Sequence, residues 1–549
     1  MYLVSSIVAA LIALALAVYR PHFCDVLFRP VEQFAAGFAR RKGLVIVTVG
    51  GAVILSRIAL LGILPIPVPA AHDEFSYLLA ADTFAHGRLA NPPHPLWIFL
   101  DTLHVLGKPT YASIFPPAQG AVLALGQLLG HPWIGVLLSM AAMCMTVTWM
   151  LQQWFPAKWA LLGAVLVFLR IDLYSYWLES YFGGAVAAIG GALVMGAYIR
   201  VLRKQRMADA LLMAIGIALL ANSRPLEGML FCVPVAASLM VRLLWHNGPP
   251  LRVTAWQVLF PVISVLLATG VFMGYYDWRV TSNAFVFPHA LYDREYVNFP
   301  VFVWQTPGPA FRYSNPQFES YFNGWVRNSR VTFSSWAKCV DFWRFFLHGA
   351  LSIPLVTLPW FIRDRRIRIL LLQFCFSAMG LLSVSWFLAH YAAPLTATIF
   401  AVLVQAMRHL RRWELGGKAA GIFLTRLVVC LLLVRVSMHL RQKPPAAERW
   451  SSSRARVAAQ LQSMPGEQLA IVRYSSQHDL GCEWVYNAAD IDHSKIVWAR
   501  EIPGLDPKPL LQYFSNRKVW LVEADSYPVR LRPFDSLSGQ RSPLAAPAK

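Results

Sequence analysis

The sequence predicts an all-α polytopic membrane protein with about twelve transmembrane helices, followed by a small C-terminal α/β domain. Of the 549 residues, 57% are hydrophobic and only 14% are charged, and the mean hydropathy is +0.49. A soluble chain of this length needs far more charge to cover its surface. The apolar residues instead form runs of about 20, the length that crosses the hydrocarbon core of a bilayer. These observations exclude a soluble multidomain protein.

The positive charge of the chain is distributed as in a membrane protein. The formal net charge is +21, and much of it lies in short clusters beside apolar runs. These clusters are Arg40-Arg41-Lys42, Arg203-Lys204-Arg206, Arg363 to Arg368 and Arg408 to Lys418. Cytoplasmic loops carry such clusters, whereas a nucleic-acid-binding protein gathers its charge on one face of a folded domain. We therefore expect the clusters to be cytoplasmic and expect no nucleic-acid partner.

The apolar runs and basic clusters together predict a topology. The candidate spans are 3–19, 44–64, 133–152, 158–171, 184–202, 208–222, 228–245, 256–275, 345–362, 368–388, 391–407 and 419–438. With the basic clusters inside, residues 65–132, 276–344 and the tail after about 438 lie outside. The expected parts are an extra N-terminal helix with a basic loop (1–43), a transmembrane domain (44–438) and an extracytoplasmic domain (439–549).

The outer segments contain recognisable secondary structure. Glu74 to Arg88 and Ala118 to Leu129 have the apolar spacing of helices that lie in the membrane interface. The tail alternates between helical and strand-like segments, which predicts a small α/β domain. Its expected helices are 451–464 and 507–514, and its expected strands are 469–474, 495–498 and 518–522.

The most informative motif is His72-Asp73-Glu74, directly after the second span. Two adjacent carboxylates at the membrane surface are costly to desolvate, which favours a functional site. A simpler interpretation is that Asp73 caps the helix expected to begin at Glu74. Both interpretations can hold, because a cap also fixes the position of the carboxylate.

Several motifs resemble a known family. An outer loop that begins with Asp73-Glu74, the segment Tyr111-Ala-Ser-Ile-Phe-Pro-Pro-Ala-Gln-Gly120 and the segment His390-Tyr-Ala-Ala-Pro394 occur in this order. Together they resemble the GT-C superfamily of integral membrane glycosyltransferases, and within it the protein O-mannosyltransferase and lipid A aminoarabinose transferase group (glycosyltransferase family 39-like). The helix at 3–19 is an extra span, and the second acid of the family has two possible counterparts, Asp172 and Glu179.

The resemblance implies a glycosyltransferase that moves a hexose or pentose from a polyprenyl-phosphate donor to an acceptor at the outer face of the membrane. It assigns Asp73 as the catalytic base or the acid that orients the acceptor, with Glu74 as its partner. The reaction also needs groups that hold the departing phosphate. Arg224, at an outer turn between two spans, is the leading candidate, with His390 and Tyr391 as further donors.

Each of these further residues also has a structural interpretation. Arg224 can pair with Glu227 or extend toward the interface, and His390 and Tyr391 can belong to an aromatic belt. Asp172, Glu179 and Tyr181 lie in an aromatic, glycine-containing segment at the outer edge. These three residues are candidates for a second acid or a sugar contact, or they anchor and pack the next helix. Glu227 is a further candidate for the same role.

Two other classes of protein are compatible with the sequence: a transporter or lipid flippase without glycosyl transfer, and a structural membrane subunit. The acceptor can be a protein, a lipid or a polysaccharide. A divalent metal is possible, because two carboxylates can hold one. The expected location is the bacterial inner membrane, among its lipids, with the site and the C-terminal domain facing the periplasm.

Overall fold

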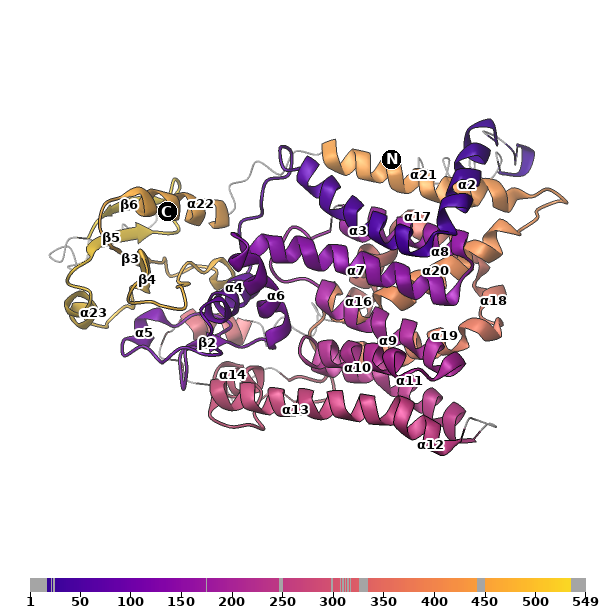
Figure 1. Ribbon diagram of the computed structural model, residues 1–549. Helices are drawn as coiled ribbons and strands as arrows, with labels where there is room; N and C mark the ends of the chain where they lie inside the picture. Colours follow the sequence, from indigo (N-terminus) through magenta and orange to yellow (C-terminus); the bar gives the residue numbers. More distant parts are fainter. Residues whose placement is uncertain are drawn as a thin grey trace.

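The computed structural model describes residues 17–20, 22, 25–173, 175–245, 250–297, 300–306, 308, 311, 313, 315, 317–324, 334–441 and 450–534. A bundle of long helices carries a smaller domain with a sheet at one of its ends (Figure 1). The first predicted span, 3–19, lies almost entirely outside the described residues.

Within the described residues, eight helical stretches are long and apolar enough to cross a membrane. They are α3 (Lys42–Ala59), α7 (Pro132–Trp154), α9 (Ala185–Lys204), part of α11 (Pro225–Trp245), a stretch from Arg252 through α13 (Phe260–Thr281), the stretch from α16 (Ser335–Phe342) to α18 (Leu358–Phe361), the stretch from η6 (Ala389–Leu395) through α20 (Thr396–Arg411), and α21 (Ala420–Arg441). Two shorter apolar helices are α10 (Met207–Ala221) and α19 (Arg368–Ser383). The fold is therefore a helical membrane bundle, as predicted.

The predicted span 158–171 is a short α-helix, α8 (Ala157–Val167), followed by a π-helical turn, η1 (Phe168–Asp172). It does not meet the length for crossing a membrane by itself, since an α-helix needs about 20 residues to do so. The described residues thus do not reproduce the predicted count of twelve spans.

Small residues let two elements near the centre of the bundle approach closely. A Cβ atom on Gly191 of α9 would lie 2.0 Å from the carbonyl oxygen of Pro394 in η6. Glycine is therefore required where α9 meets η6. This contact fixes the position of η6, the segment that carries His390 and Tyr391.

The first long loop (65–132) contains two helices that pack on each other, α4 (His72–Ala85) and α6 (Pro117–Leu128). A Cβ atom on Gly120 of α6 would lie 2.7 Å from the Cβ atom of Ala80 in α4. The loop also holds α5 (Trp97–Leu100) and a two-stranded hairpin of β1 (Val105–Leu106) and β2 (Ala112–Ser113). Both helices were predicted.

The predicted cap at the start of α4 is wrong. The helix begins at His72 and its N-cap is Ala71, so Asp73 lies inside the first turn. Glu74 instead accepts a hydrogen bond from the backbone N–H of Ala71 at 2.9 Å. A glutamate at this position caps the helix by reaching back to the preceding backbone. The Asp73 side chain is consequently free to take part in other contacts.

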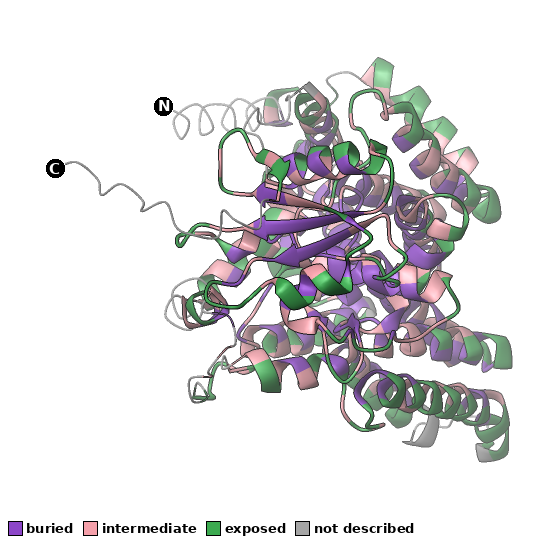
Figure 2. Ribbon diagram, turned by 90° about the vertical axis from the view of Figure 1, so that its left-hand side faces the viewer, coloured by how far each residue is buried: buried purple, intermediate pink, exposed green. Residues whose placement is uncertain are grey.

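The C-terminal domain is a four-stranded sheet with the order β4-β3-β5-β6. The strands β3 (Gln468–Arg473), β4 (Ile496–Arg500) and β5 (Lys518–Glu523) are parallel, and β6 (Arg530–Pro533) is antiparallel at the edge. The helices α22 (Trp450–Ser463) and α23 (Lys508–Tyr513) complete the predicted α/β domain. The strands β3 and β4 are mainly buried (Figure 2), whereas β5 is buried only at Leu521 and Val522. The sequence did not indicate β6, because its arginines and proline give little strand signal.

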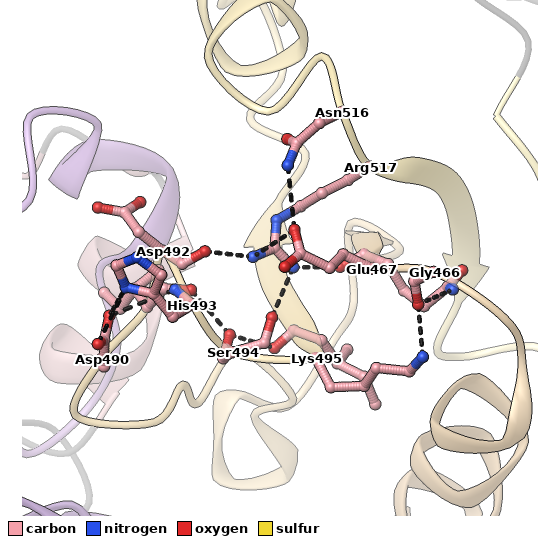
Figure 3. A network of polar contacts seen from close by, with 12 residues as sticks. Gly466, Glu467, Asp490, Asp492, His493, Ser494, Lys495, Asn516 and Arg517 are labelled. Carbon is pink, nitrogen blue, oxygen red and sulfur yellow. Dashed lines mark hydrogen bonds and ion pairs between the residues drawn. The ribbon is translucent and has the colours of Figure 1, made fainter.

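A buried arginine joins the amino ends of the parallel strands. The Arg517 guanidinium donates to the carbonyl oxygens of Ser494 at 2.7 Å and Asp492 at 2.5 Å (Figure 3). It also contacts the carbonyl oxygen of Gln468 at the start of β3, at 3.3 Å. These contacts satisfy a buried charge with backbone acceptors, and they hold the sheet as a unit.

The C-terminal domain contacts both long loops. Asp82 of α4 accepts a hydrogen bond from the Ala489 backbone N–H at 2.7 Å, and the Tyr111 hydroxyl donates to the Asn487 carbonyl at 3.0 Å. Arg500 donates to Gln317 of the second long loop (276–344) at 2.9 Å. Both loops and the domain therefore lie at the same end of the bundle, as the predicted topology requires.

A buried carboxyl group lies at this junction. Asp101 is 7% exposed and accepts a hydrogen bond from the Tyr296 hydroxyl at 3.0 Å. Burial raises the pKa of Asp101 to about 7, against the opposing effects of Tyr296 and Arg500. The folded state thus binds a proton at Asp101 that the unfolded chain releases near its ordinary pKa of about 4.

This difference makes the stability of the junction depend on pH. Because the folded pKa is raised, stability falls as pH rises from about 4 through about 7 and changes little above that. In Asp101→Asn the corresponding fall should be absent. Amide hydrogen exchange of residues 96–106 at pH 5 and pH 8, in wild type and variant, measures the difference. Asp506→Asn, at an exposed carboxylate, is the control and should match wild type; equal pH dependence in Asp101→Asn would refute this account.

Candidate functional site

Three side chains of the first long loop converge beside the start of α4. The imidazole Nδ1 of His104 makes a short contact with the Oδ1 atom of Asp73. The Nε2 atom of His72 lies 3.9 Å from the same oxygen. The two imidazole rings meet edge to face, with centroids 4.4 Å apart. We call His72, Asp73 and His104 the His-Asp-His cluster.

The backbone holds His104 in an uncommon conformation. Its φ angle is +60°, in the left-handed region that a residue with a Cβ atom seldom adopts. The His104 N–H donates to the Tyr292 hydroxyl at 3.1 Å, and its carbonyl oxygen accepts from the Ser76 hydroxyl at 2.6 Å. Such a conformation costs about 1–3 kcal/mol and persists when its surroundings hold it. His104 was not predicted as a site residue, because it stands alone between apolar residues in the sequence.

At neutral pH the cluster contains a charged carboxylate, Asp73, and a neutral imidazole, His72. Burial opposes the charge of Asp73, but the charge and hydrogen bond of His104, with a contribution from His72, hold its pKa well below the usual range. Burial, and then the charge of His104, lower the pKa of His72 to about 4. Asp73 is therefore a carboxylate, and His72 is a neutral imidazole with a free lone pair.

Arg224 lies in the turn between α10 and α11. Its guanidinium carbon is 4.4 Å from the centre of the Tyr391 ring. No described carboxylate lies within ion-pair distance of this guanidinium, so the alternative pair with Glu227 is not formed. Burial opposes its charge, but the neighbouring Tyr77, Glu227, Tyr391 and Asp73 together raise the pKa of Arg224. It is thus a permanent cation without a direct counterion among the described side chains.

Charge interactions and ring contacts connect Asp73, Arg224 and His390. The charge of Asp73 acts on both Arg224 and His390. Tyr77 stacks on Phe115 with ring centroids 4.4 Å apart, and Phe115 also packs edge to face on His104 at 5.6 Å. The predicted acid and the predicted phosphate-binding cation therefore lie in the same region.

His390 and Tyr391 enter the site from η6. The Nδ1 atom of His390 lies 2.9 Å from the Tyr176 hydroxyl, whose oxygen also accepts the His390 backbone N–H at 3.0 Å. Tyr176 therefore fixes the His390 ring, while Tyr391 lies under Arg224. The second long loop adds His289 from α14 (Pro288–Tyr296). The Nδ1 atom of His289 lies 3.0 Å from the Oδ2 atom of Asp293, and the centroids of the His289 and Phe115 rings are 6.5 Å apart.

Glu74 has a different role from the predicted one. It is 3% exposed, and its Oε2 atom accepts the backbone N–H groups of Ala70 at 2.7 Å and Ala71 at 2.9 Å. Its Oε1 atom accepts the N–H of Tyr181 at 2.9 Å. Because these three bonds occupy both oxygens, the predicted catalytic partnership with Asp73 has no contact to support it. Glu74 holds the start of α4 against the segment that contains Tyr181.

The candidates for a second acid also lie in structural contacts. Glu179 pairs with the buried Arg57 of α3 at 2.9 Å, and the Tyr181 hydroxyl donates to the Pro67 carbonyl at 3.0 Å. Asp172 is fully buried, and neither of its oxygens has a hydrogen-bond partner among the described groups. None of these three contacts the His-Asp-His cluster or Arg224. Their predicted roles as second acid or sugar contact therefore have no geometric support.

The His-Asp-His cluster has the composition of a metal site. One donor atom from each residue lies within 4.8 Å of the other two. In the described part of the chain, no second group of three or more histidine, cysteine, aspartate or glutamate side chains meets this test. The two-carboxylate site that the sequence suggested does not form, because Glu74 faces the backbone.

Comparison with known proteins gives similarity only at the level of structure. No protein-family model matches the sequence, and no curated protein is significantly similar to it. The oligosaccharyltransferase of Archaeoglobus fulgidus, solved with a tethered acceptor peptide, is 11% identical with a TM-score of 0.44, covering 87% of this chain and 69% of that one. ArnT from Cupriavidus metallidurans, solved with undecaprenyl phosphate, is 12% identical with a TM-score of 0.46, covering 87% and 92%.

A further structure of the archaeal enzyme AglB, with an inhibitory peptide and a dolichol-phosphate, is 12% identical with a TM-score of 0.38, covering 87% of this chain and 69% of that one. Because every one of these TM-scores lies below 0.5, the function of this chain has to be argued from its own residues.

The structural role of Glu74 can be tested by its effect on stability. Glu74→Ala leaves three backbone N–H groups without their acceptor, and each such loss costs about 1–3 kcal/mol. We expect a lower melting temperature for the detergent-purified variant. Glu295→Ala, at an exposed glutamate of α14, is the matched control and should melt as wild type does. A Glu74→Ala protein that melts normally but has lost activity would instead favour the catalytic role.

Proposed function

We propose that this protein transfers a sugar from a polyprenyl-phosphate donor to an acceptor at the outer face of a bacterial inner membrane. The observation that carries the proposal is the arrangement of Arg224 and Asp73. A cation without a direct counterion lies within electrostatic reach of a carboxylate, and the turn that carries it is joined to the first long loop by a hydrogen bond from the Ala118 N–H to the Asn222 carbonyl at 3.0 Å. Sugar transfer from a lipid phosphate needs these two groups.

Arg224 is suited to bind the donor phosphate. An unpaired arginine at the membrane boundary is costly, and an anion in the site relieves that cost. The planar guanidinium also matches two phosphate oxygens at once. The Tyr391 ring below it restricts its orientation, and His390 lies beside Tyr391 with ring centroids 5.1 Å apart. We assign Arg224 as the phosphate-binding residue, with His390 and Tyr391 supporting it.

A largely apolar cavity adjoins this position. It lies between α11, α19 and η6 and encloses only about 10 Å³, roughly the room for one water molecule. Its lining includes Glu227 and Tyr391 at the side of Arg224, and otherwise mainly Leu230, Phe231, Leu381, Pro394 and Leu395. An apolar lining beside a phosphate-binding cation suits the lipid part of a polyprenyl-phosphate donor.

The acceptor approaches from the side of Asp73. Its oxygen forms a bond to the anomeric carbon, while the bond from that carbon to the phosphate oxygen breaks and leaves its electron pair on the phosphate. The acceptor proton leaves to a base, and Arg224 stabilises the charge that develops on the phosphate. Asp73 acts either as that base or as the acid that orients the acceptor hydroxyl. Glu74 contributes by holding the helix turn that carries Asp73.

The transporter alternative finds little support in the described charges. Two buried arginines of the helices have partners that brace the bundle: Arg57 pairs with Glu179, and Arg426 with Glu32 at 3.1 Å. The buried Asp172 of η1 has no partner among the described groups. A transporter places ionisable groups along its substrate pathway. Here Arg224, which has no ion-pair partner among the described residues, lies near the His-Asp-His cluster at the end of the bundle. This arrangement favours a chemical reaction over transport.

Substitution of the two central residues tests the proposal. Arg224→Met removes charge-assisted hydrogen bonds of about 1.5–3 kcal/mol to the phosphate, so polyprenyl phosphate should bind roughly 10- to 100-fold more weakly. Asp73→Asn should leave this binding intact and lower sugar transfer by at least about 100-fold. Binding is measured with purified protein and polyprenyl phosphate, and transfer with a labelled lipid-linked sugar in membranes.

Arg279→Met is the control for the loss of one positive charge. Arg279 is an exposed arginine in the last turn of α13. It should bind polyprenyl phosphate as tightly as wild type does. Equal binding by Arg224→Met and Arg279→Met would remove the phosphate-binding role of Arg224. Full transfer by Asp73→Asn would remove Asp73 from the reaction.

A further inference from the structure

We propose that His72, Asp73 and His104 together bind one divalent transition-metal ion, with Zn²⁺ as the preferred ion. The inference concerns the acceptor side of the site described above. The metal site itself follows from the geometry of the His-Asp-His cluster, whereas its role in sugar transfer rests on the proposed function.

The spacing of the donor atoms fits a single ion. Ligand atoms bound at 2.0–2.2 Å in a tetrahedral arrangement lie roughly 3.4 Å apart. In the cluster all donor atoms lie within 4.8 Å, and the Nε2 atom of His72 is 3.9 Å from the Oδ1 atom of Asp73. Both histidines approach this same Oδ1 atom. Small side-chain movements of about 1 Å bring the three donors to bonding distance of one ion.

His72 lacks any other binding partner. Its Nε2 atom is beyond hydrogen-bond distance from Asp73, and its Nδ1 atom is buried without a partner among the described residues. A ring nitrogen removed from water without a hydrogen bond costs about 1–3 kcal/mol. The Nε2 atom faces the Oδ1 atom of Asp73 at 3.9 Å, beyond hydrogen-bond distance, so this nitrogen is available to bind a metal ion. The neighbouring Nδ1 atom keeps its own cost of burial whether or not the ion is bound.

His104 is held in advance of binding. The left-handed backbone and the two backbone hydrogen bonds, to Tyr292 and from Ser76, fix where its side chain begins. Phe115 and Tyr292 pack edge to face on its ring, with centroid distances of 5.6 Å and 5.8 Å. Residues that support a ligand in this way orient it for the metal. The strain at His104 has no other evident purpose.

The donor set selects the class of ion. Two imidazole nitrogens and one carboxylate oxygen suit Zn²⁺ and neighbouring transition metals, whereas Mg²⁺ and Ca²⁺ prefer oxygen ligands throughout. Three protein ligands with an open fourth position are typical of a reactive zinc site, not of a closed structural one. The side chains of His72, Asp73 and His104 are 21%, 18% and 26% exposed, so a further ligand can reach the cluster.

Within the proposed function, this site decides between the two roles of Asp73. As a metal ligand, Asp73 orients the acceptor and does not itself take the proton. An acceptor hydroxyl at the open position loses its proton more readily, since a bound cation lowers the pKa of an attached hydroxyl. The proton leaves to solvent, the acceptor oxygen bonds to the anomeric carbon, and the released electron pair stays on the phosphate at Arg224.

Metal analysis of the full-length protein tests the site without reference to activity. Protein carrying a tag free of histidine is purified in detergent, incubated with Zn²⁺ and freed from excess ion. Mass spectrometry of the metal content should then find about one Zn²⁺ per chain in wild type. We expect His72→Ala and His104→Ala to lose most of it, with binding at least roughly 10-fold weaker, because each removes one of three ligands.

His86→Ala is the matched control, because His86 is an exposed histidine of the same loop that contacts its own helix at Asp82. It should retain one Zn²⁺ per chain. His104→Gln provides a second variant in case His104→Ala fails to fold, and the melting temperature of each variant reports folding. Wild-type protein that folds and binds no Zn²⁺, or folded His72 and His104 variants that bind Zn²⁺ as wild type does, would overturn the proposal.

These results distinguish failure of the metal-site proposal from failure of the proposed function. Protein that holds one Zn²⁺ in the cluster but binds no polyprenyl phosphate keeps the metal site and contradicts the proposed function. Protein that binds the lipid through Arg224 and transfers sugar without holding Zn²⁺ contradicts the metal site and leaves Asp73 as the base.

Discussion

The position of the whole site depends on one buried carboxylate. Glu74 accepts three backbone N–H groups, from Ala70, Ala71 and Tyr181, with its two oxygens. It thereby joins the chain that leaves α3, the first turn of α4 and the segment before α9. His72 and Asp73 lie in that same turn, so their direction is determined by a residue that takes no part in the proposed chemistry. The proposed reactive acid, Asp73, and the acid that positions it, Glu74, are neighbours in sequence.

The buried arginines and Arg224 differ in how their charges are compensated. Arg57, Arg500 and Arg517 are buried, and each is satisfied by a carboxylate or by carbonyl oxygens of its own surroundings. Arg224 is different: it is half-buried, and its described neighbours are aromatic rings and the carboxylates of Glu227 and Asp73, neither of which forms an ion pair with it. An arginine at the membrane boundary without an ion-pair partner is stabilised when a ligand supplies the anion. The same reasoning applies to His72, whose imidazole lacks a hydrogen bond.

The helical bundle and the α/β tail were predictable because each follows from local periodicity. Apolar runs identified the long helices, and the alternating tail indicated β3, β4 and β5. Asp73 and Arg224 could be singled out as candidates because charged residues beside apolar runs are conspicuous. His104 could not, since its position comes from a left-handed backbone and from contacts with Ser76 and Tyr292, which are distant in sequence. The backbone contacts of Glu74 could not be predicted either, because the sequence cannot show which way each of two adjacent carboxylates points.

The central claim is that Arg224 and Asp73 belong to one site that receives a lipid-linked phosphate. A cryo-electron microscopy structure of the full-length protein with bound polyprenyl phosphate measures this most directly. The account predicts phosphate density within hydrogen-bond distance of the Arg224 guanidinium, in a cavity that also opens onto Asp73. Phosphate density remote from Arg224, or closed off from Asp73, would contradict it.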